Sequence, residues 1–275
     1  MNWNVGYSVI YGLLGGLFEF LPVSPDAHQA LLLRLAGLGQ PGYGMSLAVH
    51  IGALAAVIFS CFGKINKLAL ERRIAALPPR KRKRQPETVS LSELRLLKTA
   101  AIPVVLSCLL AAFFHSYLNR FWLMVIFVVL NGVFIALPHY LTRANKDARS
   151  ISPLDALLIG LCSILGILPG LSRMGILISA GSIRGMDRNF CLDFTYLLAI
   201  PWLIALCVID IAMLILQGPA GAAFVHTLFA LLASFGAGVA GIRMMRFLVV
   251  KNDSEGFAYY NWGLAMLAFV IYLIG

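Results

Sequence analysis

Residues 15–28 read GGLFEFLPVSPDAH, a stretch in which an apolar run breaks and starts again. The run over 7–22 breaks at Leu21-Pro22, and residues 24–26 (Ser-Pro-Asp) look like a helix start, with an N-cap, a first-turn proline and an acidic residue. The apolar run that follows, 26–38, is too short to cross a hydrocarbon core of about 30 Å. The stretch therefore predicts a re-entrant hairpin, which dips into a membrane and returns to the same side.

The same arrangement recurs at residues 168–175, which read LPGLSRMG. An apolar run over 153–169 ends at this Leu-Pro, and a second short run, 171–183, follows it. Each hairpin is also followed later by an Ala-Ile-Pro segment, at 101–103 and at 199–201. Two such halves predict inverted repeats, an arrangement that places a site near the membrane midplane where two broken helices meet.

The composition excludes a soluble protein. Hydrophobic residues make up 60% of the 275 residues and charged residues 12%, and the mean hydropathy is +0.86. In soluble domains, hydrophobic residues average about 45–50% and charged residues about 25%. We therefore expect an all-α polytopic membrane protein: one transmembrane domain over 1–275, with repeats over about 1–141 and 150–275. The ten apolar runs are 7–22, 26–38, 44–62, 99–116, 121–141, 153–169, 171–183, 190–216, 225–243 and 256–275.

The basic residues predict the orientation. A formal net charge of +10 in a membrane protein favours Lys/Arg-rich cytoplasmic loops, so we expect no nucleic-acid partner. The polar segment 64–98 holds eleven Lys/Arg and three Glu, which predicts a cytoplasmic loop; binding of anionic lipid headgroups is its alternative role. Counting spans outward from this loop places 19 of the 22 basic residues inside, opens the hairpins toward opposite sides and leaves both termini extracytoplasmic.

Ionisable groups lie at the first break, although each costs roughly 2.5–3.5 kcal/mol at the centre of a membrane helix. Glu19 and His28 flank the turn, where they can exchange protons, or the carboxylate can hold a metal ion. The alternatives are structural. Ser24 and Asp26 can simply begin a helix, and His28 can be satisfied by a backbone carbonyl group.

The second break combines small residues with a cation. Gly170 and Gly175 allow close backbone approach, and Ser172 can cap the helix that follows. The N–H groups at that helix start, together with the guanidinium of Arg173, form an anion site suited to phosphate. The alternative is that Arg173 only neutralises an acidic side chain of the first hairpin.

Five further ionisable side chains lie inside apolar runs and belong to no motif. Asp193 and Asp210 lie on one span and favour hydrogen bonds to neighbouring helices. We interpret His50, His115 and His226 as structural.

The two hairpins resemble the motifs of the BacA/UppP family, the undecaprenyl-diphosphate phosphatases of bacterial membranes. The family's first motif is EGxxEFLPVSSTGH, which residues 19–24 and His28 match. Its second is PGxSRSG, which residues 169–170, 172–173 and Gly175 match. The order of spans is similar as well, so the likeness covers nearly the whole chain. It implies a bacterial inner-membrane protein built from inverted repeats with two re-entrant helix pairs.

The resemblance also implies a substrate and a set of roles. The substrate is the C55 polyprenyl diphosphate of cell-envelope synthesis, whose terminal phosphate is removed with the help of a divalent cation, Mg²⁺ or Ca²⁺. Glu19 would serve the metal or proton transfer, and His28 would be the histidine of the pocket. Arg173 would clamp the phosphate, which the hydroxyl groups of Ser24 and Ser172 would face.

Several positions depart from the family's motifs. The leading Glu is Gly15, the second Ser is Pro25, the Thr-Gly pair is residues 26–27 (Asp-Ala), and the Ser after the arginine is Met174. Asp26 can supply the missing carboxylate, as a second metal ligand or as a nucleophile. We hypothesise a polyprenyl-diphosphate phosphatase with an altered site. The alternative is a lipid-phosphate transporter or binding protein of the same fold without hydrolysis, and a homodimer is a further hypothesis.

Overall fold

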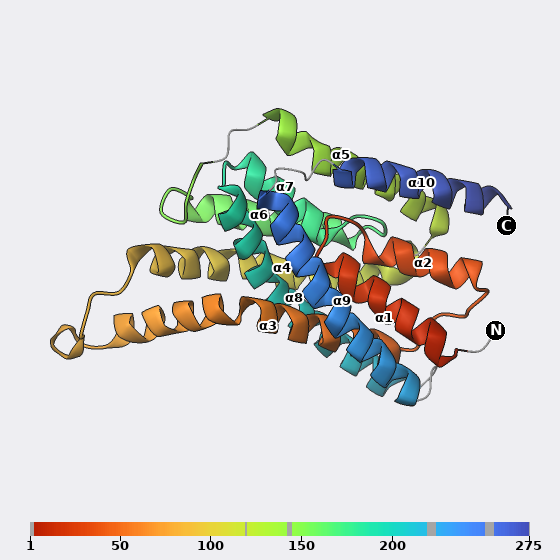
Figure 1. Cartoon of the computed structure of the whole chain (residues 1–275), viewed down its shortest axis with the longest axis horizontal. Helices are drawn as coiled ribbons and strands as arrows, with labels where there is room; N and C mark the ends of the chain where they lie inside the picture. The colour runs from red at the N-terminus through yellow and green to blue at the C-terminus, as the bar shows by residue number, and fades with distance from the viewer. Residues whose placement is uncertain (1–2, 119, 142–144, 219–223, 251–255, 275) are drawn as a thin grey trace.

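The computed structural model describes residues 3–118, 120–141, 145–218, 224–250 and 256–274 (Figure 1). These residues form helices and no extended strand, so the all-α prediction is confirmed. The α-helices are α1 (Val5–Glu19), α2 (Pro25–Leu35), α3 (Tyr43–Ala76), α4 (Thr88–Leu118), α5 (Phe121–Leu141), α6 (Pro153–Cys162), α7 (Arg173–Ile183), α8 (Arg188–Gln217), α9 (Phe224–Val250) and α10 (Gly256–Ile274). Two 3-10 helices are η1 (Pro79–Lys81) and η2 (Ser163–Ile167).

Six of the described helices are long and apolar enough to cross a membrane: α3, α4, α5, α8, α9 and α10. Large apolar side chains are exposed on the outside of the bundle, among them Phe113, Ile215 and Phe224. Water would solvate such a surface poorly, whereas the hydrocarbon of a bilayer solvates it well. The prediction of a polytopic membrane protein is confirmed.

Both predicted breaks are present, and each separates short helices. At the first break, α1 has 15 residues and α2 has 11. The helix that follows the second break, α7, also has 11 residues. Eleven residues of helix rise only about 16 Å, roughly half of a hydrocarbon core. The lengths are those of a helix pair that turns back inside a membrane. Re-entry itself stays a prediction.

The first hairpin is held to the bundle by small residues of α1 and α9. A Cβ atom on Gly12 would lie 2.3 Å from the carbonyl oxygen of Ala230, and one on Gly16 would lie 2.1 Å from that of Ser234. On both helices the two residues are four apart, the small-xxx-small pattern typical of closely packed membrane helices. The sequence analysis did not single out this pattern, although it fixes the helix that carries Glu19.

Helix packing relates the two halves of the chain. α1 packs against α9 and α6 against α4; α3 packs against α9 and α8 against α4. In addition, α5 lies along α10 (Figure 1). These are the pairs expected if α1–α5 and α6–α10 are related by a two-fold axis. The Ala-Ile-Pro segments do not follow this relation, because Pro103 lies in α4 and Pro201 in α8, which are fourth and third in their halves. The repeat boundaries stay a prediction.

The segment 64–98 is largely helical, whereas the sequence analysis treated it as a loop. α3 continues to Ala76 and α4 begins at Thr88. The 34 residues of α3 rise about 51 Å, well beyond a hydrocarbon core of about 30 Å. Figure 1 shows the two helices projecting from the bundle, with their turn at the end opposite the start of α1 and the end of α10.

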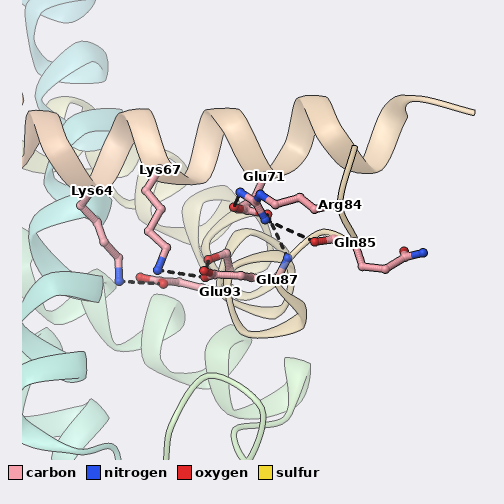
Figure 2. A network of polar contacts seen from close by, with 8 residues as sticks. Lys64, Lys67, Glu71, Arg84, Gln85, Glu87 and Glu93 are labelled. Carbon is pink, nitrogen blue, oxygen red and sulfur yellow. Dashed lines mark hydrogen bonds and ion pairs between the residues drawn. The ribbon is translucent and has the colours of Figure 1, made fainter. Parts of the chain in front are cut away.

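Ion pairs explain why this polar segment is helical. One ion pair joins α3 to α4, Lys64–Glu93 at 2.9 Å, and two join α3 to the segment that precedes α4, Lys67–Glu87 at 2.9 Å and Glu71–Arg84 (Figure 2). Hydrogen bonds from Lys67 and Ser90 hold the pKa of Glu87 below its usual range. All three glutamates of the segment are thus paired, and its remaining basic side chains give the projection an excess of positive charge.

Candidate functional site

The two breaks meet tip to tip. The Ser172 hydroxyl donates to the carbonyl oxygen of Leu21 over 3.1 Å, and a Cβ atom on Gly175 would lie 3.3 Å from the Cα of Pro22. Gly170 has a φ of +101°, and a Cβ atom there would lie 2.5 Å from a carbonyl oxygen of α5. Both glycines thus allow the close approach that the sequence predicted. Phosphate binding by this turn stays a prediction.

Two buried asparagines hold the tips together. Asn131 of α5 donates from Nδ2 to the Pro22 carbonyl oxygen over 3.3 Å, and its Oδ1 accepts from the Ser172 backbone N–H over 2.9 Å. Asn261 of α10 donates to the same Pro22 oxygen over 3.2 Å and accepts from Asn131 over 2.8 Å. The sequence analysis missed both residues. An amide side chain inside an apolar run was the available signal, because such a group must find polar partners.

Trp202 of α8 joins the acidic and the basic side chain of the predicted site. Its Nε1 donates to Oε1 of Glu19 over 2.8 Å. The guanidinium carbon of Arg173 lies 5.7 Å from the centre of a ring of the same side chain, within the range of a cation–π interaction. Trp202 is fully buried. Neither motif contains it, so sequence reasoning did not find it.

Arg173 is placed to receive an anion. Its Nε is buried and has no hydrogen-bond partner among the described residues. A Cβ atom on Gly166 would lie 3.3 Å from this nitrogen, so a glycine lets the backbone approach the arginine closely. Glu19 lies within electrostatic range, yet the ion pairs of the described chain do not include Arg173. An unsatisfied buried donor costs about 1–3 kcal/mol, which a bound phosphate oxygen would recover.

Both serines of the breaks cap the helices that follow them. Ser24 Oγ accepts from the Ala27 N–H over 3.3 Å, and Ser172 Oγ accepts from the Gly175 N–H over 3.1 Å. Both side chains are buried. The expectation that Ser24 and Ser172 act as helix N-caps is therefore confirmed. A role of either hydroxyl toward phosphate stays a prediction.

His28 is held from both sides. Its Nδ1 lies 2.7 Å from the Ser24 carbonyl oxygen, and its Nε2 lies 2.8 Å from the Tyr260 hydroxyl. A carbonyl oxygen only accepts, so Nδ1 carries a hydrogen. The ring stacks on Phe18 with a centroid distance of 3.7 Å. The expected backbone-carbonyl partner is thus present, and catalysis by His28 stays a prediction.

Asp26 is exposed in the first turn of α2, where it favours the helix start. Asp26 and Glu19 both lie within electrostatic range of His50, so the two carboxylates belong to the same region. Across the described ranges, no group of three or more His, Cys, Asp or Glu side chains is arranged to hold a metal ion. Two carboxylates do fit Mg²⁺ as it is usually bound beside phosphates, with waters and phosphate oxygens as the other ligands.

The two aspartates of α8 bond to neighbouring helices, as predicted. Oδ2 of Asp210 lies 2.6 Å from Nδ1 of His50 on α3. Oδ1 of Asp193 accepts from Arg246 of α9 over 3.2 Å. Both predictions are confirmed.

The space next to Gly15, where the family's first motif has a glutamate, is filled. A Cβ atom on Gly15 would lie 2.4 Å from Cγ1 of Val49 and 2.8 Å from Nε2 of Gln29. Nε2 of Gln29 in turn donates to the backbone carbonyl of Tyr11 over 3.4 Å. A second carboxylate at this position would displace these side chains, and Glu19 is the sole carboxylate of α1.

Comparison with known proteins gives a consistent result. A family model described as bacitracin resistance protein BacA matches residues 8–267, a range that includes both breaks. Similar proteins named undecaprenyl-diphosphatase occur in Desulforapulum autotrophicum (28% identical, covering 95% of this chain and 96% of the relative) and Thermodesulfovibrio yellowstonii (29%, covering 96% and 96%). Another, from Idiomarina loihiensis, is 30% identical and covers 70% of this chain and 71% of its own.

Proposed function

Because this chain belongs to the family of the bacitracin resistance protein BacA, we propose that it hydrolyses undecaprenyl diphosphate to undecaprenyl phosphate and inorganic phosphate. Relatives that match almost the full chain are named for this activity. The protein is then a phosphoric anhydride hydrolase of cell-envelope synthesis, and its substrate is a lipid that lies in the same membrane.

One observation of the structure supports the proposal above all others: the buried Nε of Arg173, at the meeting point of the two breaks, has no hydrogen-bond partner among the described residues. A half-buried guanidinium that forms no ion pair with the described residues is suited to the terminal phosphate. The exposed apolar surface of the bundle suits the polyprenyl chain, which would remain in lipid.

The neighbouring groups suggest how the phosphorus would be attacked. Arg173 would offset the negative charge that develops as water adds to the terminal phosphorus. Glu19, oriented by Trp202, would act with Asp26 to hold a divalent cation, Mg²⁺ or Ca²⁺, against the phosphates. Such a cation, when bound, supplies further neutralisation of the diphosphate charge. For Ser172 the predicted role toward phosphate would require its hydroxyl to leave the carbonyl of Leu21.

The location follows from the same features. We place the protein in the bacterial inner membrane, with the positively charged 64–98 projection in the cytoplasm. The start of α1 and the end of α10 lie at the opposite end of the molecule, which supports extracytoplasmic termini (Figure 1). A homodimer stays a hypothesis.

Phosphate release tests the function directly. Purified full-length protein is given C55 or C15 polyprenyl diphosphate with Mg²⁺ or Ca²⁺, and free phosphate is measured. The change Arg173→Ala should lower kcat/KM about 100-fold or more, the loss typical of removing one charge-stabilising donor. Arg188→Ala, at an exposed arginine outside the site, is the matched control and should keep wild-type activity. Wild-type release no greater than that of Arg173→Ala would remove the proposal.

Lipid-phosphate transport without hydrolysis is the alternative, and the filled space beside Gly15 favours it because one motif carboxylate is lost. The same protein in liposomes would then move a short-chain polyprenyl phosphate across the bilayer. Transport that is unaffected by Glu19→Gln, together with absent phosphate release, would support this alternative.

A further inference from the structure

The proposed hydrolysis needs a group that takes a proton from the attacking water. The histidine of the first break is poorly placed for this task. Both ring nitrogens of His28 are engaged, one by the Ser24 carbonyl and one by the Tyr260 hydroxyl. Its ring is stacked on Phe18, and the residue is only 8% exposed. Proton transfer at His28 would first require one of these hydrogen bonds to break.

A different histidine has the geometry of a base. Nδ1 of His50 on α3 lies 2.6 Å from Oδ2 of Asp210 on α8. A carboxylate only accepts, so Nδ1 carries the hydrogen and Nε2 keeps its lone pair when the ring is neutral. The described residues provide no hydrogen-bond partner for Nε2, and the side chain is 23% exposed. An aspartate that orients a histidine in this way is a recurring arrangement in hydrolytic enzymes.

Charged groups of the candidate site lie within electrostatic range of His50. Besides Asp210, the groups that act on it most strongly are Glu19 of α1 and Asp26 of α2. Tyr11 of α1 lies within range of both Asp26 and Asp210. No group of α4 or α9, which also pack against α3, is among those that act most strongly on His50. Geometry agrees: Val49, which precedes His50, lies against Gly15 of α1, about one helical turn before Glu19.

Building on the proposed function, we propose that His50, oriented by Asp210, is the general base of the reaction. Nε2 takes a proton from water while the water oxygen forms its bond to the terminal phosphorus. The bond from that phosphorus to the bridging oxygen breaks, and its electron pair leaves on undecaprenyl phosphate. Inorganic phosphate is the second product. Asp210 stabilises the imidazolium until His50 returns the proton to solvent.

The pH dependence of kcat tests this role with full-length protein and C15 polyprenyl diphosphate. A base must be unprotonated, so wild-type activity falls on the acidic side as His50 gains its proton. His50→Gln should lower kcat about 100-fold or more and remove this acidic limb. Asp210→Asn should lower kcat and shift the acidic limb of the pH profile to a different pH. His226→Gln, at a histidine of α9 outside the site, is the matched control and should leave rate and limb unchanged.

Two further measurements separate a catalytic role from a structural one. In His50→Ala, added imidazole should restore part of the activity, because it can replace the missing ring. The His28→Gln variant should retain the acidic limb of the pH profile, whether or not its kcat changes. The inference is overturned if His50→Gln retains the limb with wild-type kcat, or if His28→Gln loses it; phosphate release by the wild type would still stand. If the wild type releases no phosphate, the proposed function fails, and the inference with it.

Discussion

Trp202 shows how one side chain can hold two opposite charges near each other without joining them. Its Nε1 satisfies the carboxylate of Glu19, and its ring face attracts the guanidinium of Arg173. A direct ion pair between these two groups would compete with phosphate for Arg173. The indole therefore positions both groups and leaves the buried Nε for a ligand.

The change Trp202→Phe separates the two contacts of Trp202, because it removes the Nε1 donor to Glu19 and keeps an aromatic ring beside Arg173. A hydrogen bond to a charged group contributes about 1.5–3 kcal/mol, so we expect kcat/KM for phosphate release to fall about 10- to 150-fold. Trp262→Phe is the control: its Nε1 donates to the carbonyl oxygen of Val129, outside the site. Equal activities of the two variants would show that the bond to Glu19 is unimportant.

Pairs of helices place these side chains. α1 carries Glu19 and is held against α9 by Gly12 and Gly16, and α5 and α10 bring the asparagines that bridge the two breaks. The site therefore depends on how closely backbones approach, at positions that carry no reactive group. A change at such a position should alter stability and activity together.

The change Gly16→Ala should push α1 away from α9, because the new methyl carbon would start 2.1 Å from the Ser234 carbonyl oxygen. Overpacking of this kind costs about 1–3 kcal/mol, so the temperature of thermal unfolding in detergent should fall, together with phosphate release. In Gly63→Ala the added methyl meets open space on α3, and alanine favours a helix by up to about 1 kcal/mol. A fall in unfolding temperature for Gly63→Ala as large as that for Gly16→Ala would contradict the explanation.

Across the entire chain, the packing of α1–α5 against α6–α10 follows the exchange expected of inverted halves. The two breaks meet at one point, to which both halves contribute residues; their entry from opposite sides of the membrane stays a prediction. The first half supplies Glu19 and His50. The second half supplies Arg173, Trp202 and Asp210, the hydrogen-bond partner of His50. The basic 64–98 projection lies at one end of the molecule, and its charge should determine the orientation.

Labelling of single cysteines checks the orientation in intact cells. In a variant without the five native cysteines, Gln85→Cys marks the turn of the projection and Gly39→Cys marks the exposed segment after α2. A membrane-impermeant thiol reagent should label Gly39→Cys in intact cells, and Gln85→Cys only after the membrane is permeabilised. The reverse pattern would invert the proposed topology.

Local sequence was sufficient for the class of fold and for the two breaks. Runs of apolar residues and Leu-Pro breaks depend only on neighbours along the chain, so they predicted an all-α membrane protein with short helices beside 21–24 and 168–172. The same local rules identified Ser24 and Ser172 as N-caps. They missed the helical form of 64–98, where ion pairs of α3 with α4 and with the segment before α4 stabilise the polar helices.

Contacts between distant parts of the chain determined which groups are engaged and which are free. His28 is occupied by Tyr260, while His50 is oriented by Asp210, and Glu19 and Arg173 meet through Trp202. The motifs assigned the proton-transfer role to His28, because a motif records residues that are close in sequence. Hydrogen bonds and cation–π contacts depend instead on distances in space, and only the packed helices set those distances.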